Sequence, residues 1–326
     1  HEDPDNPVRG FHLNTLASTL TTWQEVVEKF LTANDQMKKG NVELMKVWTN
    51  TEMGQTWEED GETIEDDELM KRREKYKCEV PEEVLYLTAG VDTQDDRFEI
   101  EVVGWGPEYE SWGIRYAAIY GDNSDINNQV WQDLDTFLLQ TFEKPDGTKM
   151  KLSCVCIDSG GHRTNQVYKF CKARFNRRVF AIKGSNDSAA AYIQKPSKSN
   201  REGAYLFTLG VDTGKSLLMD RLKLEEEGPG FCHFPKEEGK GYDEKYFKGL
   251  TSEKKVMRYK MGRPYFAWEL KDKGEHKRNE ALDCRNYATA AIEIINVPLK
   301  KPDKKKDATQ AKKIVKRGRR RSGGIL

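Results

Sequence analysis

The pattern of apolar and polar positions changes character near residue 84. From there to residue 182, short apolar runs typical of strands alternate with stretches of helical periodicity. The expected strands are 85–92, 97–105, 111–120, 151–157 and 179–182, and the expected helices are 127–141 and 164–174. Three consecutive strands followed by helix-connected strands predict a mixed α/β sheet that is antiparallel first and parallel afterwards.

The first strand ends on Gly90-Val91-Asp92, which places one carboxylate at an edge of the sheet. A polar turn follows at 93–96, and an Asp at this point is also common simply because it opens an Asx-type turn. The second strand alternates between two faces, with the period of a half-buried strand: Phe98, Ile100 and Val102 on one face, and Glu99, Glu101 and Val103 on the other.

Residues 1–80 show none of this alternation. Thr22 and Glu25 form a capping-box pattern at the start of a helix whose apolar positions recur at helical spacing up to residue 31. Further helices are expected at 41–49 and 65–77. We interpret this part as a helical linker that packs on something outside the chain, and a satellite of the main domain is an equally good interpretation. Because the chain starts at His1 without Met, we expect it to be a fragment of a longer protein.

The remainder of the chain is less regular. It predicts a strand at 204–209, a helix at 213–222, helical turns at 242–249, a hairpin formed by 254–259 and 265–270, and a final helix at 279–295. The segment from Gly210 to Ser216, GVDTGKS, resembles a phosphate-binding P-loop. It has three residues between its glycines where the motif needs four, so it predicts a strand-to-helix turn and not an ATP site.

Composition allows a real core and about two domains, with 326 residues of which 37% are hydrophobic. The formal net charge of zero conceals a segregation of charge. Residues 300–326 hold twelve Lys or Arg against two Asp, a local charge of +10, which leaves −10 for residues 1–299. We expect a linker at 1–80, an α/β domain at 81–299, and a flexible, disordered basic tail at 300–326 that meets a polyanion or an acidic partner.

The six cysteines indicate a reducing compartment, because they form no CxxC pair. The ligand pairs of a structural zinc site are absent for the same reason. Cys154 and Cys156 lie two residues apart in an expected strand and should share one buried face. The sequence has no signal peptide and no apolar run of about 18 residues, so we expect an intracellular protein without a membrane segment.

Three acidic residues occupy positions that favour a shared site. Asp92 and Asp158 each end an expected strand, and strand ends in a mixed sheet commonly line a crevice. Asp283 lies near the start of the last helix, and Glu280, three residues before it, shares its face. A carboxylate on an otherwise apolar helix face needs a partner. Divalent cations such as Mg²⁺ and Mn²⁺ prefer oxygen ligands, and two of them about 4 Å apart can activate water and stabilise the leaving oxygen of a phosphodiester.

The order of these elements resembles the ribonuclease H-like nuclease superfamily. Four short motifs are more specifically similar to the nuclease part of the tailed-phage terminase large subunit, in its lambda-like branch: Ala89–Gln94, Ile157–Gly160, Ile182–Gly184 and Asn279–Cys284. The segments at 10–14 and 48–57 are similar to the region just after the packaging ATPase in that family. The resemblance covers about residues 8–297, and it implies that the ATPase itself lies outside this chain.

The resemblance implies roles for individual residues. Asp92, Asp158 and Asp283 would be the catalytic ligands of two Mg²⁺ or Mn²⁺ ions and would serve an endonuclease that cuts concatemeric phage DNA. Glu280 and His162 are secondary candidates, as an extra ligand and as a contact for phosphate or water. An ordinary loop position is the alternative for His162. Lys183, at a strand end, would meet a phosphate or simply remain solvated.

The resemblance also implies partners. These are double-stranded DNA, a terminase small subunit, a portal protein contacted by the basic tail, and further copies of the large subunit in a ring, all in the host cytoplasm. The tail could equally bind DNA without sequence preference. Two alternative functions remain open at this point: a resolvase- or transposase-like nuclease of the same superfamily, and a non-catalytic assembly module in which the acids only cap turns.

Overall fold

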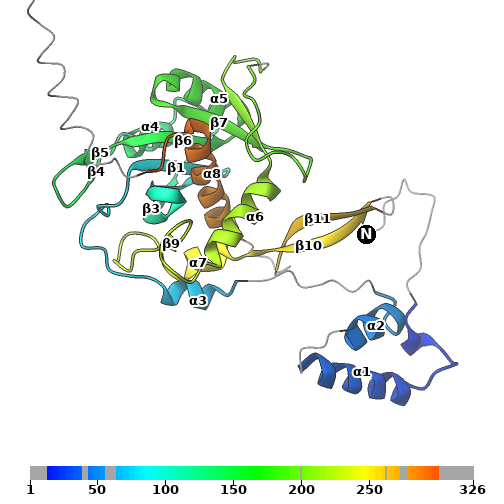
Figure 1. Ribbon diagram of the computed structural model, residues 1–326. Coiled ribbons are helices and arrows are strands. Elements are labelled where there is room, and N and C mark those ends of the chain that lie inside the picture. Colours follow the sequence, from blue (N-terminus) through cyan, green and yellow to red (C-terminus); the bar gives the residue numbers. More distant parts are fainter. Residues whose placement is uncertain are drawn as a thin grey trace, which may run out of the picture. The chain divides into compact units, whose positions relative to one another are not determined.

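The computed structural model describes residues 13–38, 43–55, 64–198, 200–260, 263–271 and 278–300 (Figure 1). Its contacts divide the chain into two units, residues 1–61 and residues 62–326. Each unit is described by itself.

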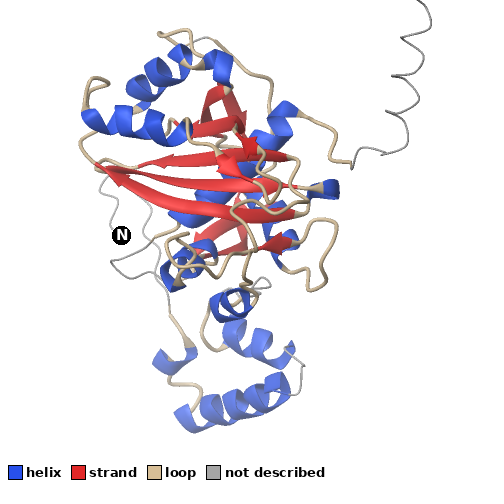
Figure 2. Cartoon of the chain, turned by 90° about the vertical axis from the view of Figure 1, so that its left-hand side faces the viewer, coloured by secondary structure: helices blue, strands red, loops and turns tan. Residues whose placement is uncertain are grey.

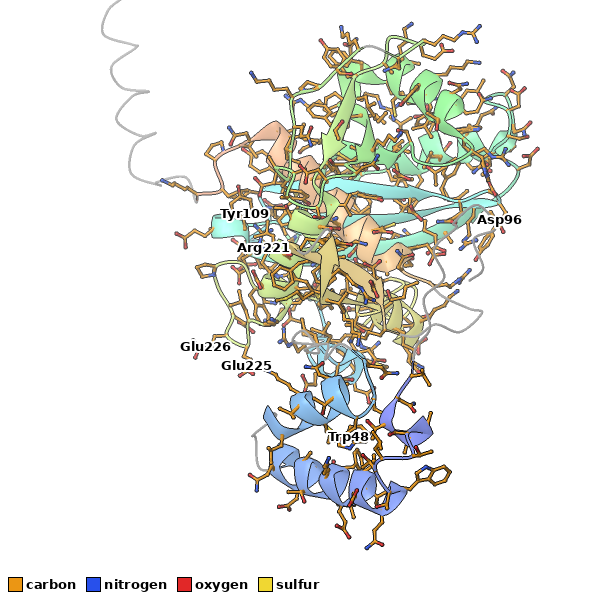
Figure 3. The ribbon with its side chains drawn as sticks, turned by 90° about the vertical axis from the view of Figure 1, so that its right-hand side faces the viewer. Trp48, Asp96, Tyr109, Arg221, Glu225 and Glu226 are labelled. Atoms are coloured by element: carbon orange, nitrogen blue, oxygen red, sulfur yellow. The ribbon has the colours of Figure 1, made fainter. Side chains whose placement is uncertain are left out.

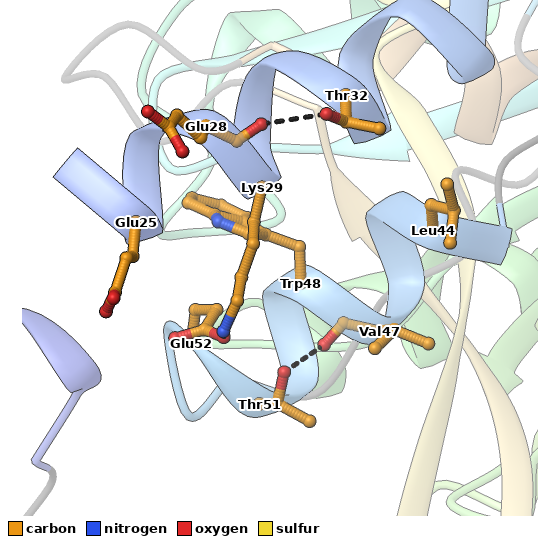
Figure 4. A pocket seen from close by; sticks show the side chains of 9 residues that line it. All are labelled: Glu25, Glu28, Lys29, Thr32, Leu44, Val47, Trp48, Thr51 and Glu52. Atoms are coloured by element: carbon orange, nitrogen blue, oxygen red, sulfur yellow. Dashed lines mark hydrogen bonds and ion pairs between the residues drawn. The ribbon is translucent and has the colours of Figure 1, made fainter. Parts of the chain in front are cut away.

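The first unit contains a short 3-10 helix and two α-helices: η1 (Thr15–Ala17), α1 (Trp23–Lys38) and α2 (Glu43–Thr51). The predicted capping box is confirmed, because Thr22 and Glu25 each bond the other's backbone N–H through their side chains. Between the helices, the Phe30 and Trp48 rings lie 4.9 Å apart, and Lys29 forms an ion pair with Glu52 at 2.6 Å. Figure 4 shows the pocket that Lys29, Trp48 and Glu52 line together with other residues of the two helices.

The apolar surface of the first unit is only partly covered by its own residues. Val26, Ala33 and Met45 are buried. A larger set of apolar side chains is exposed: Leu13, Leu16, Leu20, Trp23, Val27, Phe30, Leu31, Leu44 and Val47. Helices of this composition normally bury such a surface against a further element.

The second unit is built on a mixed sheet of seven strands in the order β8-β7-β6-β1-β2-β3-β9 (Figure 2). These are β1 (Tyr86–Thr93), β2 (Arg97–Trp105), β3 (Ser111–Tyr120), β6 (Leu152–Asp158), β7 (Val179–Gly184), β8 (Leu206–Leu209) and β9 (Cys232–His233). Strands β1, β2 and β3 pair antiparallel, whereas the pairs β1–β6, β6–β7, β7–β8 and β3–β9 are parallel. The predicted ribonuclease H-like mixed sheet is therefore confirmed.

Helices cover both faces of this sheet. The core on one face includes residues of α4 (Gln129–Leu138) and α5 (Thr164–Ala173). The core on the other face includes residues of α8 (Glu280–Ile295), where Cys154 and Cys156 are buried together as predicted. Beside α8 lie α6 (Val211–Leu222) and α7 (Glu244–Leu250), and α3 (Asp66–Lys71) packs on α7.

Several smaller elements complete the second unit: η2 (Pro107–Tyr109), η3 (Phe175–Arg177), the hairpin of β4 (Phe142–Glu143) and β5 (Lys149–Met150), and the hairpin of β10 (Glu253–Lys260) and β11 (Arg263–Leu270). The last hairpin confirms the prediction for this segment. The P-loop-like sequence lies at the junction of β8 and α6, as predicted, but only Gly210 lies between the two elements, and Val211–Ser216 already belong to the helix.

Strand β2 corrects one prediction, because it is buried on both faces and not on one. Glu101, expected on a half-exposed face, is fully buried and accepts a hydrogen bond from Arg285 of α8 at 2.7 Å. The hydroxyl groups of Tyr242 and Tyr246 donate to the same carboxylate oxygen. Glu101 therefore pairs with buried partners from the helical layer, whereas Glu99, also buried, accepts hydrogen bonds from Arg97 of β2 and Tyr116 of β3. Both acids have partners inside the protein and do not face water.

The boundary between the two units of the structure lies at a different place from the predicted domain boundary. The sequence suggested a boundary at residue 80, whereas the division by contacts falls between Gly61 and Glu62. Leu69 of α3 is completely buried in a cluster with residues of α7, and Val80 joins the main core of the sheet. The basic tail lies outside the described residues except for Lys300.

Candidate active site

Two of the three predicted acids lie side by side at one end of the sheet. Asp92 is the penultimate residue of β1 and Asp158 is the last residue of β6. These strands are parallel neighbours, with Val91 opposite Ile157, so the next residue of each strand reaches the same edge. The predicted convergence of strand ends is therefore observed.

The third acid reaches this edge because α8 packs very closely on β1. Gly90 makes the approach possible, since a Cβ atom added to it would lie 2.0 Å from the carbonyl oxygen of Cys284. The hydroxyl of Thr88 in β1 donates a hydrogen bond to the carbonyl oxygen of Ala288 at 2.8 Å, which links the strand to the next turn of α8. Asp283, in the first turn of α8, is thereby held near Asp92.

Burial raises the pKa values of all three acids, and neighbouring carboxylates raise those of Asp92 and Asp283 further. The pKa of Asp92 lies well above its usual range, first because of burial and then because of the charges of Asp283, Asp158 and Glu280. Burial also raises the pKa of Asp158, against the opposing effect of hydrogen bonds from the backbone of Gly160 and Ser159. The pKa of Asp283 is raised to about 6, mainly by burial, although Lys215 opposes the shift. Such a cluster favours either protons or a bound cation.

The side chain of Lys215 places a buried positive charge beside this cluster. The ammonium nitrogen of Lys215 in α6 lies 3.2 Å from a carboxylate oxygen of Asp283 and 2.8 Å from both carboxylate oxygens of Glu253 in β10. Asn279 donates hydrogen bonds to Glu253 and to Asp283, each at 2.9 Å. Burial acts to lower the pKa of Lys215, but its two acidic neighbours raise it above the ordinary value, so the lysine remains charged.

Sequence reasoning missed Lys215 and Glu253. Lys215 belongs to the Gly-Lys-Ser sequence that was considered only as a defective P-loop, and Glu253 begins a hairpin strand rich in charge. Only the packing of α6 and β10 around α8 shows that these two side chains face inward. The sequence signal that could have indicated them was a lysine on the apolar face of a predicted helix and a glutamate just before a predicted strand. Both patterns are common in proteins without such a site.

The secondary candidates differ in their placement. Glu280 is buried and contributes to the raised pKa of Asp92, but its carboxylate accepts a hydrogen bond from Arg97 at 2.6 Å. Lys183 is exposed in β7, and its charge acts to lower the pKa of Asp158. His162 is largely exposed, and its Nδ1 atom lies 3.3 Å from the carboxylate of Asp95. The site therefore brings together Asp92, Asp158, Asp283, Glu280 and Lys183, while His162 lies in the loop after β6 against the β1–β2 turn.

The family model for the endonuclease domain of the terminase large subunit gpA matches residues 8–305. The chain belongs to this terminase family. It is 37% identical to the terminase large subunit of Escherichia phage lambda over 299 residues, which is 90% of this chain and 44% of that protein. It is 33% identical to the terminase large subunit of Enterobacteria phage P21, over 87% of this chain and 43% of that protein. The chain thus spans less than half the length of these relatives.

Two solved terminase structures show a weaker likeness. A mutant nuclease domain of the large terminase subunit gp2 of bacterial virus Sf6, solved with manganese, has a TM-score of 0.43 and 17% identity and covers 68% of this chain and 96% of that chain. The HK97 bacteriophage large terminase has a TM-score of 0.38 and 10% identity, over 83% of this chain and 51% of that chain.

Membership of the terminase family confirms the resemblance found in the sequence and removes the basis for the resolvase- or transposase-like alternative. Within the residues that the structure describes, no helix of this terminase domain combines the length and apolar character needed to span a bilayer.

Proposed function

We propose that this terminase domain is a metal-dependent endodeoxyribonuclease that cuts concatemeric viral DNA during genome packaging. The observation that carries the proposal is the convergence of Asp92, Asp158 and Asp283 from β1, β6 and α8, with pKa values that burial raises for all three and that neighbouring carboxylates raise further for Asp92 and Asp283. Buried carboxylates in such numbers are stabilised by a cation, and nuclease chemistry on a phosphodiester uses that cation directly.

The donor set fits hard divalent ions. The three aspartates offer only oxygen atoms, which Mg²⁺ and Mn²⁺ prefer over nitrogen or sulfur ligands. Asp92, Asp158 and Asp283 would hold these ions, and two ions is the number that the family resemblance implies. When bound, they would supply Lewis-acid activation of water and stabilisation of the leaving oxygen.

The protein's own groups orient these ligands. The side-chain amide of Gln94 donates a hydrogen bond to Asp92 at 2.5 Å, and the backbone N–H of Gly160 donates to Asp158 at 3.1 Å. The ammonium group of Lys215 and the side-chain amide of Asn279 contact the carboxylate of Asp283. Each carboxylate is thus fixed in direction before any ligand arrives, which is the arrangement expected of a preorganised metal site. The exposed ammonium group of Lys183 is available to contact a phosphate of the substrate.

The partners follow from the family. We propose that the substrate is double-stranded DNA, that a terminase small subunit selects the cleavage site, and that the large subunit works as a ring at the portal in the host cytoplasm, with its ATPase outside this chain. The charge of +10 on residues 300–326 supports a contact of the tail with DNA or with the portal protein.

Plasmid cleavage tests the proposal. Supercoiled DNA is incubated with the 326-residue chain in Mn²⁺, in Mg²⁺ and in EDTA, and wild type is compared with Asp92→Asn, Asp158→Asn and Asp133→Asn. Asp133 is an exposed aspartate of α4 and serves as the matched control. Metal-dependent nicking that only the first two variants lose supports the nuclease. Absence of cleavage with every metal, together with no metal-induced change in melting temperature, favours the non-catalytic assembly module.

A further inference from the structure

A second group of metal-ligating side chains lies around His233 in β9. The ring is buried, with 6% of the side chain exposed, and stacks on Trp112 at a centroid distance of 4.8 Å and an interplanar angle of 3°. Its Nδ1 atom lies 2.7 Å from a carboxylate oxygen of Glu74, and its Nε2 atom lies 3.1 Å from a carboxylate oxygen of Glu110. The orientation of the ring is therefore fixed on both edges and on one face.

Two carboxylates on one imidazole need an additional positive charge. An ionised carboxylate only accepts hydrogen bonds, whereas a neutral imidazole carries one N–H group. One of the two contacts can thus be an ordinary hydrogen bond, and the other places a nitrogen lone pair against a carboxylate oxygen. That second contact is favourable only when the imidazole is protonated or when both atoms bind the same metal ion.

Glu227 supplies a third candidate ligand. One ligand atom each from Glu74, Glu227 and His233 lie within 4.8 Å of one another. Glu227 is exposed in the loop between α6 and β9, whereas His233 is buried. One imidazole nitrogen and two carboxylates form a donor set that suits Zn²⁺, Mn²⁺ or Co²⁺ better than Mg²⁺. With Nδ1 as the ligand atom, the Nε2–H group donates to Glu110, and a histidine that binds a metal commonly donates its other N–H group to a carboxylate in this way.

We propose that Glu74, Glu227 and His233 bind a divalent transition-metal ion, with Glu110 orienting the imidazole. This site is separate from the three aspartates. In Figure 3, Asp96, in the turn after β1, lies at one end of the sheet. Tyr109, next to Glu110, lies at the opposite end, together with Glu225 and Glu226, which precede Glu227.

The ion would join three segments that are far apart in the sequence. Glu74 precedes β1 and is fixed by backbone hydrogen bonds to Phe234 and Lys236, which continue from β9. Glu227 comes from the loop after α6, the helix that carries Lys215. A bound ion therefore stabilises the folded second unit, and we expect binding to raise its melting temperature. The inference does not depend on the proposed nuclease function.

Co²⁺ and Zn²⁺ titrations of the whole chain test the proposal. Glu227→Gln is the principal variant, because the side chain is exposed and its loss should leave the fold intact, and Glu226→Gln is the matched control. Asp92→Asn removes a ligand of the aspartate site. Binding of Zn²⁺ to the second site should weaken at least about tenfold in Glu227→Gln, since loss of even a supporting partner costs roughly 10- to 100-fold. It should be unchanged in Glu226→Gln and in Asp92→Asn.

The Co²⁺ absorption spectrum gives a second readout. Nitrogen ligation at His233 should produce a visible band that persists in Asp92→Asn and is lost in Glu227→Gln and in Glu74→Gln. The proposal is overturned if Zn²⁺ affinity is the same in Glu227→Gln and Glu226→Gln, or if Asp92→Asn alone removes all metal binding. In either case a proton, and not a metal ion, occupies the contact between His233 and Glu74.

Discussion

The buried lysine beside the aspartates makes the sharpest stability prediction. In Lys215→Met a side chain of similar length loses its charge, and the carboxylates of Asp283 and Glu253 lose their common cation. Both ends of the Lys215–Glu253 pair are more than nine-tenths buried, with 8% and 7% of the side chains exposed. Solvent therefore screens the remaining negative charges poorly.

The size of the effect follows from this burial. Removing one partner of a buried ion pair costs about 3–5 kcal/mol, because the other charge stays buried without compensation. A loss of that size is a large share of a typical domain stability of about 5–15 kcal/mol. In the double variant Lys215→Met/Glu253→Gln one of the uncompensated charges is also removed, so part of the loss should be regained.

Urea unfolding followed by tryptophan fluorescence measures these differences. In EDTA, Lys215→Met should unfold at a clearly lower urea concentration than wild type, and Mn²⁺ should raise its midpoint more than that of wild type, because the ion compensates the charge that the lysine no longer balances. Lys248→Met serves as the control, since this lysine is exposed and forms its ion pair with the equally exposed Glu244 of the same helix. Equal midpoints for Lys215→Met and Lys248→Met in EDTA would refute the reasoning.

Three further predictions concern the same site. Gly90→Ala should lower stability by about 1–3 kcal/mol or more and reduce the Mn²⁺-induced rise in melting temperature, because the new methyl group meets the carbonyl oxygen of Cys284. Without metal, the free energy of unfolding should fall from about pH 4 to pH 6, because folded Asp283 keeps its proton up to about pH 6 and an unfolded aspartate loses it near pH 3.9. The fall should be smaller, but not absent, in Asp283→Asn, because Asp92 and Asp158 also have raised pKa values; an undiminished fall in this variant would contradict the prediction. Glu280→Gln should retain metal-dependent plasmid cleavage, since Arg97 already holds that carboxylate; loss of cleavage equal to that of Asp92→Asn would make Glu280 a ligand.

Local patterns were sufficient to predict the sheet and two of the acids. Three consecutive apolar segments, the second with a period of two, and the helix-connected strands after them predict antiparallel and then parallel pairing, which the structure contains. Asp92 and Asp158 were found because both end strands, and parallel strand ends meet at one edge whatever the details of packing. Asp283 was found through its position on an apolar helix that must pack on the sheet.

Other features depend on packing that no local pattern contains. The alternation in β2 is the same for a strand exposed on one face and for a strand whose acids pair with buried cations, so the burial of Glu101 against Arg285 could not be predicted. Strand β9 has only two residues, too few for any period. Glu74 and His233 are 159 positions apart, and the bridge between Glu74 and Pro235, two residues after β9, brings them together.

Anomalous scattering from Mn²⁺ in crystals of the chain tests the central claim most directly. The proposed function predicts Mn²⁺ peaks bound by Asp92, Asp158 and Asp283 in wild type, and their loss or displacement in Asp158→Asn. Mn²⁺ that binds elsewhere in the molecule while these three carboxylates remain without it, under conditions in which the chain cleaves DNA, would contradict the account.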